Sequence, residues 1–192
     1  MLFAIAFGSM SATAGRLAVP ALLPTIIETF RISDAEAGYA VTATLVAFGV
    51  AQYPGGRLSD KLSRKTVLVV AAGLFLVGFA VLSVSPTFLL LLVGAVVIGV
   101  ANGLYLPASL AEISELFSSQ RGRAFGVNAA SIQLGSAIGP GLVAVALAVG
   151  WWRLAFVPVV ALFGGVLVVL HLWSSDPYDF SGVPEFDLRA TI

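Results

Sequence analysis

The sequence predicts an all-α membrane protein with six transmembrane helices. Hydrophobic residues make up 59% of the 192 residues and charged residues only 10%, whereas a soluble domain of this size needs a far more polar surface. The apolar residues fall into six stretches that approach or exceed the roughly 20 residues required to cross a bilayer. Short connections, which carry most of the charges, separate these stretches.

In chain order, the six spans are expected over residues 2–27, 37–53, 66–84, 88–110, 124–149 and 154–173. The first follows no basic segment and runs well beyond the about 15 apolar residues of a signal peptide, so we expect it to be retained. Residues 1–173 then form one transmembrane domain. Residues 174–192 are polar and acidic, and we expect a cytoplasmic tail or the start of an inter-domain linker.

The basic residues predict the orientation of the spans, because Lys and Arg concentrate on the cytoplasmic side of a membrane protein. The second-to-third and fourth-to-fifth connections lie on one side, together with both termini. They carry Arg57, Lys61, Arg64, Lys65, Arg121 and Arg123. The opposite connections carry only Arg31 and Arg153. Both termini are therefore expected in the cytoplasm, with the protein in the plasma membrane.

Polar residues are distributed unevenly over the spans. Spans one, two, four and five contain the candidate substrate-binding residues Arg16, Gln52, Asn102, Tyr105, Asn128 and Gln133. Spans three and six contain nothing more polar than serine before His171, which we expect to pack or snorkel at the interface. Polar side chains in a bilayer face protein or water, so the four polar spans should line an interior and the other two should face lipid. This is the pattern of two inverted three-helix repeats, although chance could also produce it.

Arg16 is the most informative of these residues. An arginine in the middle of a span costs ~2.5–3.5 kcal/mol on insertion scales, and no carboxylate lies at a similar depth in the sequence. A guanidinium in a wet cavity is suited to a carboxylate or phosphate, which it binds in a bidentate manner. The alternative is a structural arginine that bonds backbone carbonyls freed by Pro20 and Pro24. Those prolines are expected to interrupt span one, as Pro107 interrupts span four.

A charged motif, residues 56–65, joins the second and third spans. It contains Gly56, Asp60, Lys61, Arg64 and Lys65 in what we expect to be a tight turn. Asp60 can accept hydrogen bonds from Arg64, and the bases can pair with acids at nearby helix ends. Such a cluster can break and re-form when helices move. On charge alone, an ordinary cytoplasmic loop is the simpler interpretation.

The spacing of this motif resembles the signature loop of the major facilitator superfamily, with Ser63 in place of the second glycine. The resemblance covers residues 1–173 and implies a six-helix N-terminal half of that fold. It also implies that Asp60 and Arg64 help to latch two halves together in the outward-open state, with Glu115 as an acidic partner. The Trp152-Arg153 pair is likewise similar to the family pattern.

Span five contains Gly126, Gly135, Gly139 and Pro140. This run resembles the glycine-proline motif of the family's antiporter branches, although Val143 and Ala144 depart from its closing glycine pair. Small residues also permit close helix packing by themselves. Arg16 is similar to the first-span arginine of the organic-anion transporters in the family, which contacts the substrate anion. Ala95 stands where many proton-coupled relatives carry an arginine.

These features predict secondary transport of a small solute, with an organic anion as the leading substrate class and possibly a coupling ion. The alternatives are an efflux antiporter for drugs and a non-transporting structural or truncated protein. We expect no enzymatic activity, catalytic residue, metal site or cofactor, since Ser9 and Ser136 lack a histidine at a plausible depth. The formal net charge of zero gives no reason to expect nucleic-acid binding. The expected partners are the bilayer and a second six-helix half.

Overall fold

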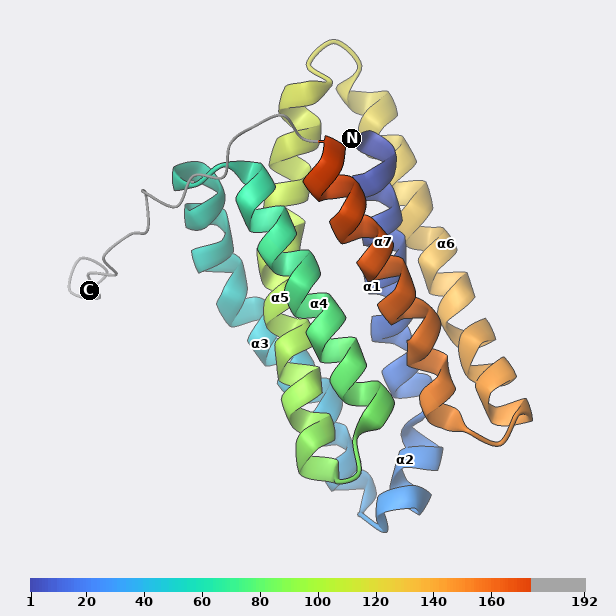
Figure 1. Ribbon diagram of the computed structural model, residues 1–192. Coiled ribbons are helices and arrows are strands. Elements are labelled where there is room, and N and C mark those ends of the chain that lie inside the picture. Colours follow the sequence, from blue (N-terminus) through green and yellow to red (C-terminus); the bar gives the residue numbers. More distant parts are fainter. Residues whose placement is uncertain (174–192) are drawn as a thin grey trace, which may run out of the picture.

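The computed structural model describes residues 1–173, all of which belong to an all-helical bundle. The helices are α1 (Leu2–Ala21), α2 (Leu23–Phe30), α3 (Asp34–Lys61), α4 (Arg64–Val84), α5 (Phe88–Leu116), α6 (Arg121–Ala148), the 3-10 turn η1 (Trp152–Phe156) and α7 (Val157–Trp173). The long helices run alternately up and down (Figure 1). The predicted acidic tail lies outside the described residues.

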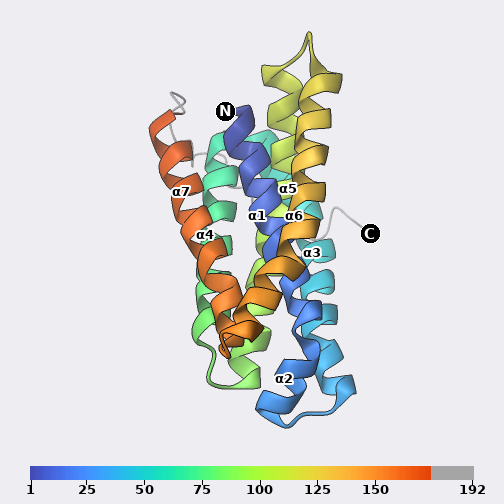
Figure 2. The same ribbon diagram turned by 90° about the vertical axis from the view of Figure 1, so that its right-hand side faces the viewer.

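The two ends of the bundle differ in charge. One end gathers the start of α1, the α3–α4 and α5–α6 connections and the end of α7, while the other gathers α2, the α4–α5 connection and η1 (Figures 1 and 2). The first end, which we call the basic end, carries Arg57, Lys61, Arg64, Lys65, Arg121 and Arg123. The predicted segregation of charge is therefore present along the bundle axis.

Five of the helices are long and apolar enough to cross a membrane: α1, α4, α5, α6 and η1 with α7. The sixth long helix, α3, has 28 residues. At 1.5 Å per residue it is roughly 42 Å long, which exceeds a hydrocarbon core of about 30 Å. It falls short only in apolarity, because its uncharged central segment, residues 37–56, includes Tyr, Thr, Gln, Gly and Pro residues.

The boundaries of the predicted spans need three corrections. Span one does not run to residue 27, because the chain turns at Leu22 and a separate helix α2 follows; Pro24 has no N–H to continue the hydrogen bonds of α1. The charged motif is not a loop, since α3 continues to Lys61 and only Leu62 and Ser63 separate it from α4. Pro107 does not interrupt span four, because α5 passes through it to Leu116.

Short polar side chains explain where several helices begin. The Ser33 hydroxyl accepts from the Glu36 N–H, and the Glu36 carboxylate accepts from the Ser33 N–H at 2.8 Å, which forms a capping box at the start of α3. Ser63 accepts from the Thr66 N–H at the start of α4, and Thr87 accepts from the Leu90 N–H at the start of α5. Each cap satisfies a backbone donor that has no partner inside its helix.

An aromatic core joins the two helices that we expected to face lipid. Phe75 and Phe79 of α4 stack on Phe163 of α7, with ring centroids 4.6 and 5.9 Å apart, and all three are fully buried. The opposite side of α4 exposes Val70 and Val77. These helices therefore bury one face in the bundle, and their outward faces are mostly apolar, with His171 exposed near the end of α7.

Two parallel helix pairs show the same close approach. A Cβ atom on Gly135 or Gly139 of α6 would overlap the backbone carbonyl of Met10 or Ala14 of α1. A Cβ atom on Gly99 or Gly103 of α5 would overlap the carbonyl of Thr44 or Phe48 of α3. In both pairs, glycines four residues apart meet carbonyls four residues apart. The two helix pairs correspond in the predicted internal repeats, in which spans one and five match spans four and two, but the glycines lie on span five in one pair and on span four in the other.

Candidate functional site

Three of the candidate substrate-binding residues, Arg16, Asn102 and Tyr105, lie around one cavity of about 160 Å³. We call it the polar cavity. Its lining comes from four helices: Ser9, Ala12, Thr13 and Arg16 of α1, Phe48 of α3, Asn102, Tyr105 and Leu106 of α5, and Ile132 of α6. These are the four spans that were predicted to share an interior. Neither α4 nor α7 contributes to it.

Two of the five polar side chains that line the polar cavity already make hydrogen bonds to the backbone. The Tyr105 hydroxyl donates to the Ile5 carbonyl at 2.8 Å, which ties α5 to α1. The Thr13 hydroxyl donates to the Ser9 carbonyl, also at 2.8 Å. Arg16 and Asn102 make no such contact with any residue that the structure describes, so the guanidinium and the amide remain available to a ligand.

Arg16 also lines a second cavity, of about 200 Å³, between α1 and α3. We call it the side pocket; its other lining residues are Leu17, Val19, Pro20, Val41, Thr44 and Leu45. Arg16 is half-buried. Within residues 1–173 no acidic side chain forms an ion pair with it. The sequence argument that no carboxylate lies at the depth of this cation therefore agrees with the structure of residues 1–173.

The other three candidate substrate-binding residues lie elsewhere. Gln52 on α3 and Gln133 on α6 are exposed and line neither cavity. Asn128 is 3% exposed, and its Oδ1 has no hydrogen-bond partner among the described residues. The structure thus brings together three of the six candidates.

The structure brings Arg64 of the charged motif together with Glu115 of α5. The Arg64 guanidinium pairs with the Glu115 carboxylate and donates to the Ala111 carbonyl at 3.1 Å. Lys65 is 5% exposed. Asp60 is exposed and makes no ion pair with Arg64. Gly56 and Lys61 lie on the last turns of α3, with Lys61 exposed at its end.

The helix-packing motif of span five is divided between two faces of α6. Gly135 and Gly139 are buried against α1. Gly126 has open space where a Cβ atom would lie, and Pro140 is exposed inside the helix. Only the two central glycines therefore pack within the described bundle.

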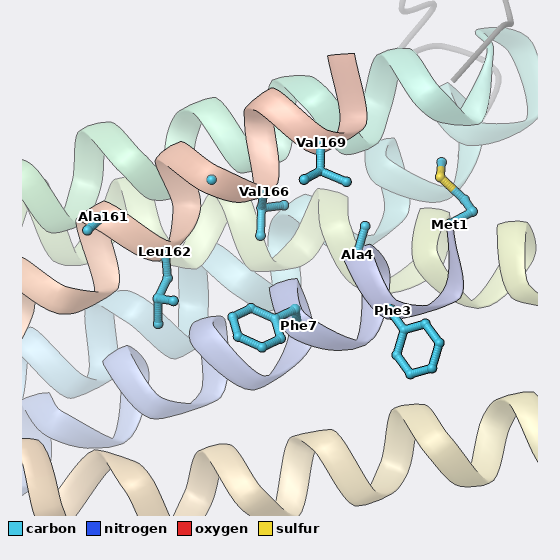
Figure 3. A pocket seen from close by; sticks show the side chains of 9 residues that line it. Met1, Phe3, Ala4, Phe7, Ala161, Leu162, Val166 and Val169 are labelled. Carbon is cyan, nitrogen blue, oxygen red and sulfur yellow. The ribbon is translucent and has the colours of Figure 1, made fainter. Parts of the chain in front are cut away.

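A larger cavity, of about 500 Å³, opens between the first turns of α1 and the last turns of α7 (Figure 3). Apolar residues line it, with Phe3, Phe7 and Val169 among them. It contains no charged side chain and none of the predicted site residues. Its chemistry matches lipid chains rather than a polar solute.

Sequence reasoning missed Ser9, Thr13 and Phe48 as cavity residues. Ser9, Thr13 and Arg16 are spaced by four and three residues, which places them on one helix face, and this spacing was a signal. It also gave Arg153 no structural role. The Arg153 guanidinium donates to the Ser85 carbonyl at 2.7 and 3.1 Å and lies over the Trp152 ring. This contact ties η1 to the end of α4 at the end opposite the basic residues.

A family model described as Major Facilitator Superfamily matches residues 3–188. The methylenomycin A resistance protein of Bacillus subtilis is 24% identical over 170 residues, which cover 88% of this chain and 36% of that protein. The probable sulfoacetate transporter SauU of Cupriavidus necator is 26% identical over 176 residues, which cover 91% of this chain and 41% of the transporter.

The fold is similar to that of a bacterial homologue of the human lysosomal transporter Spinster, in an inward-facing and occupied conformation. The TM-score is 0.79 at 18% identity, and the match covers 96% of this chain and 46% of the other. The chain thus spans between about a quarter and a half of the length of the relatives that it matches.

Proposed function

Because the chain belongs to the major facilitator superfamily, we propose that it forms the six-helix N-terminal half of a secondary transporter that moves a small organic anion by alternating access. The substrate site of such a transporter lies between two halves near the middle of the membrane. The polar cavity and the side pocket would form this half's share of that site. A second half supplies the rest, as a separate chain, a further segment or a second copy.

Arg16 carries the proposal. It is a half-buried cation in a membrane-crossing helix, and it has no acidic partner among the described residues. Its desolvation is costly unless an anion or water compensates for it. Asn102, which also lines the polar cavity, can donate a hydrogen bond from its amide to the same anion. Together they form a recognition pair for a carboxylate, sulfonate or phosphate oxygen. SauU, named for sulfoacetate, shows that a relative is linked to an anion of this kind.

The basic end suggests the orientation. By the distribution of Lys and Arg, this end would lie in the cytoplasm, with the protein in the plasma membrane. The Arg64–Glu115 contact and Asp60 lie at that end, where the charged motif would latch the two halves. Asp60 has no ion pair within residues 1–173, so its carboxylate is available to a group of the second half.

Drug efflux by antiport is the second candidate. The methylenomycin A resistance protein is named for a drug, and most of the side pocket is apolar. An antiporter for uncharged drugs leaves Arg16 without a role, however. A protein that does not transport is the third candidate, and a second six-helix segment encoded next to this chain would argue against it.

The test is uptake of organic anions into proteoliposomes that contain this chain together with the second half, normalised to inserted protein. Arg16→Lys keeps the charge but removes the planar fork, so the affinity should fall by ~1–3 kcal/mol. Arg16→Gln should nearly abolish uptake while insertion is unchanged. Arg123→Gln, which removes an exposed arginine at the basic end, is the matched control and should transport normally. Wild-type anion affinity in Arg16→Gln would refute the anion proposal and favour drug efflux.

A further inference from the structure

We propose that the substrate is an amphipathic anion, whose charged group binds Arg16 and Asn102 in the polar cavity while an apolar group of about the size of one ring occupies the side pocket. This inference rests on the proposed function and names the substrate class of the same site. The observation behind it is that Arg16 lines two cavities of different chemistry. A ligand held by its guanidinium can therefore extend into either one.

The side pocket offers almost no polar group other than Arg16 itself. Leu17, Val19 and Pro20 of α1 and Val41 and Leu45 of α3 form its apolar wall. The remaining residue, Thr44, donates its hydroxyl to the Ala40 carbonyl at 2.8 Å within its own helix. The side pocket would therefore leave a polar extension of the substrate without partners and would favour an apolar one.

The size of the side pocket limits the apolar group. Its volume is about 200 Å³, and an apolar protein cavity of roughly 150 Å³ holds a benzene ring. A phenyl group or a chain of several methylenes thus fits. Each methylene buried there should tighten binding about fourfold.

The charged group has a separate place. In the polar cavity, the Thr13 and Tyr105 hydroxyls are committed to carbonyls of α1. Arg16, which lines both cavities, and Asn102, which lines the polar cavity, would bind the anion. The site would thus recognise two features of the substrate independently. Arg16 would bind its negative charge, and Leu45 and its neighbours would contact its apolar group.

Alkyl and aryl sulfonates are suitable probes, because they stay ionised and do not leak through the bilayer. We would compare uptake of methanesulfonate, hexanesulfonate and benzenesulfonate by the assembled transporter, this chain with its second half, in proteoliposomes. Hexanesulfonate and benzenesulfonate should have a KM at least tenfold below that of methanesulfonate. Hexanol, which is uncharged, should not compete with them.

Substitution of Leu45 then tests the side pocket. Leu45 is 50% exposed, so Leu45→Trp can fill the pocket without disturbing the core. It should cancel the advantage of hexanesulfonate and leave the KM of methanesulfonate within twofold. Leu45→Ala, which removes part of the apolar wall, should reduce the advantage of hexanesulfonate and leave the KM of methanesulfonate within twofold. It provides the test should the Trp variant not insert, and an unchanged preference for hexanesulfonate would then overturn the inference. Val77→Trp, on the exposed face of α4, is the control and should behave as the wild type.

Two further results would overturn the inference and leave the proposed function intact: equal KM values for the three sulfonates in the wild type, or an equal loss of methanesulfonate and hexanesulfonate affinity in Leu45→Trp. Failure of the proposed function looks different. In that case, Arg16→Gln would transport methanesulfonate as well as the wild type does.

Discussion

Arg64 and Glu115 form an ion pair that joins the first residue of α4 to the last turn of α5. The Glu115 side chain is 64% exposed, whereas that of Arg64 is 22% exposed. The same guanidinium donates to the Ala111 carbonyl. The arginine is thus the more deeply anchored partner, and the two substitutions should have unequal effects.

We expect Glu115→Gln to lower the free energy of unfolding by only ~0.2–1 kcal/mol, since an exposed ion pair is screened by water and salt. Arg64→Ala should cost ~1–2 kcal/mol, because the bond to the Ala111 carbonyl is lost as well. Denaturant unfolding in mild detergent at low and high salt measures both. An equal loss in the two variants would contradict the role given to the Ala111 carbonyl.

Asp60→Asn should separate stability from transport. Asp60 is exposed and has no ion pair within residues 1–173, so the stability of this half should change by less than ~0.5 kcal/mol. If the charged motif acts between the halves, transport should nevertheless fall, with less of the outward-open state. Unchanged transport in Asp60→Asn and Arg64→Ala would leave the motif only its role in membrane orientation.

Tyr105→Phe should act on stability rather than on substrate affinity. The variant loses the hydrogen bond to the Ile5 carbonyl and keeps the ring, so we expect a cost of ~0.5–1.5 kcal/mol. The KM for anions should stay within about twofold, because the hydroxyl is committed to the backbone and not to the ligand. Asn102→Leu, measured in parallel, should weaken anion binding. A large rise of KM in Tyr105→Phe would restore a direct role for its hydroxyl.

The glycines of α6 should respond to alanine with opposite signs. Gly135→Ala and Gly139→Ala place a methyl group against carbonyls of α1, which should cost ~1–3 kcal/mol, as overpacking does. Gly126→Ala and Gly141→Ala meet no atom of the described bundle, so the helix propensity of alanine should make them neutral or stabilising by up to ~1 kcal/mol. Thermal unfolding of the four single variants tests this. A similar cost at all four positions would argue against the α1–α6 contact.

Cysteine labelling should reveal the orientation, because the chain has no cysteine of its own. Single cysteines at Asp34, Ser63 and Ser119 lie in or beside connections, the first at one end of the bundle and the others at the basic end. Only the cysteine at position 34 should react with a membrane-impermeant reagent in intact cells. Labelling at position 63 from outside would reverse the proposed orientation. Ser181, a further suitable position that should label only from the cytoplasm, lies outside the described residues.

Sequence patterns predicted the fold because hydrophobic length and helix number follow directly from the thickness of a bilayer. They also pointed to Arg16, Asn102 and Tyr105, which line the polar cavity, but the same argument failed for Gln52 and Gln133, which are exposed. They could not show that Tyr105 bonds to Ile5, a contact between residues 100 positions apart. Nor could they separate Gly126 from Gly135, because the difference depends on which face of α6 meets α1.

Helix ends were harder to predict than helix centres. The charged residues after Tyr53 suggested a loop, but a helix outside a bilayer tolerates charge, and α3 continues to Lys61. Proline had opposite effects in two places. Pro24 coincides with a new helix after Leu22, whereas Pro107 is accommodated inside α5. Residue type alone does not distinguish the two cases.

Because α3 continues beyond its apolar segment, a tilt of the helix within the membrane moves its charged end sideways. From Tyr53 to Lys61 the helix adds eight residues, or roughly 12 Å at 1.5 Å per residue. If α3 moves as one body through Pro54, which lies inside the helix, a tilt of about 10° within the membrane would sweep Asp60 and Lys61 sideways by about 2 Å. A shift of that size is enough to break a hydrogen bond. A small rotation of α3 near the substrate can therefore form or break a contact of Asp60 or Lys61 at the membrane surface.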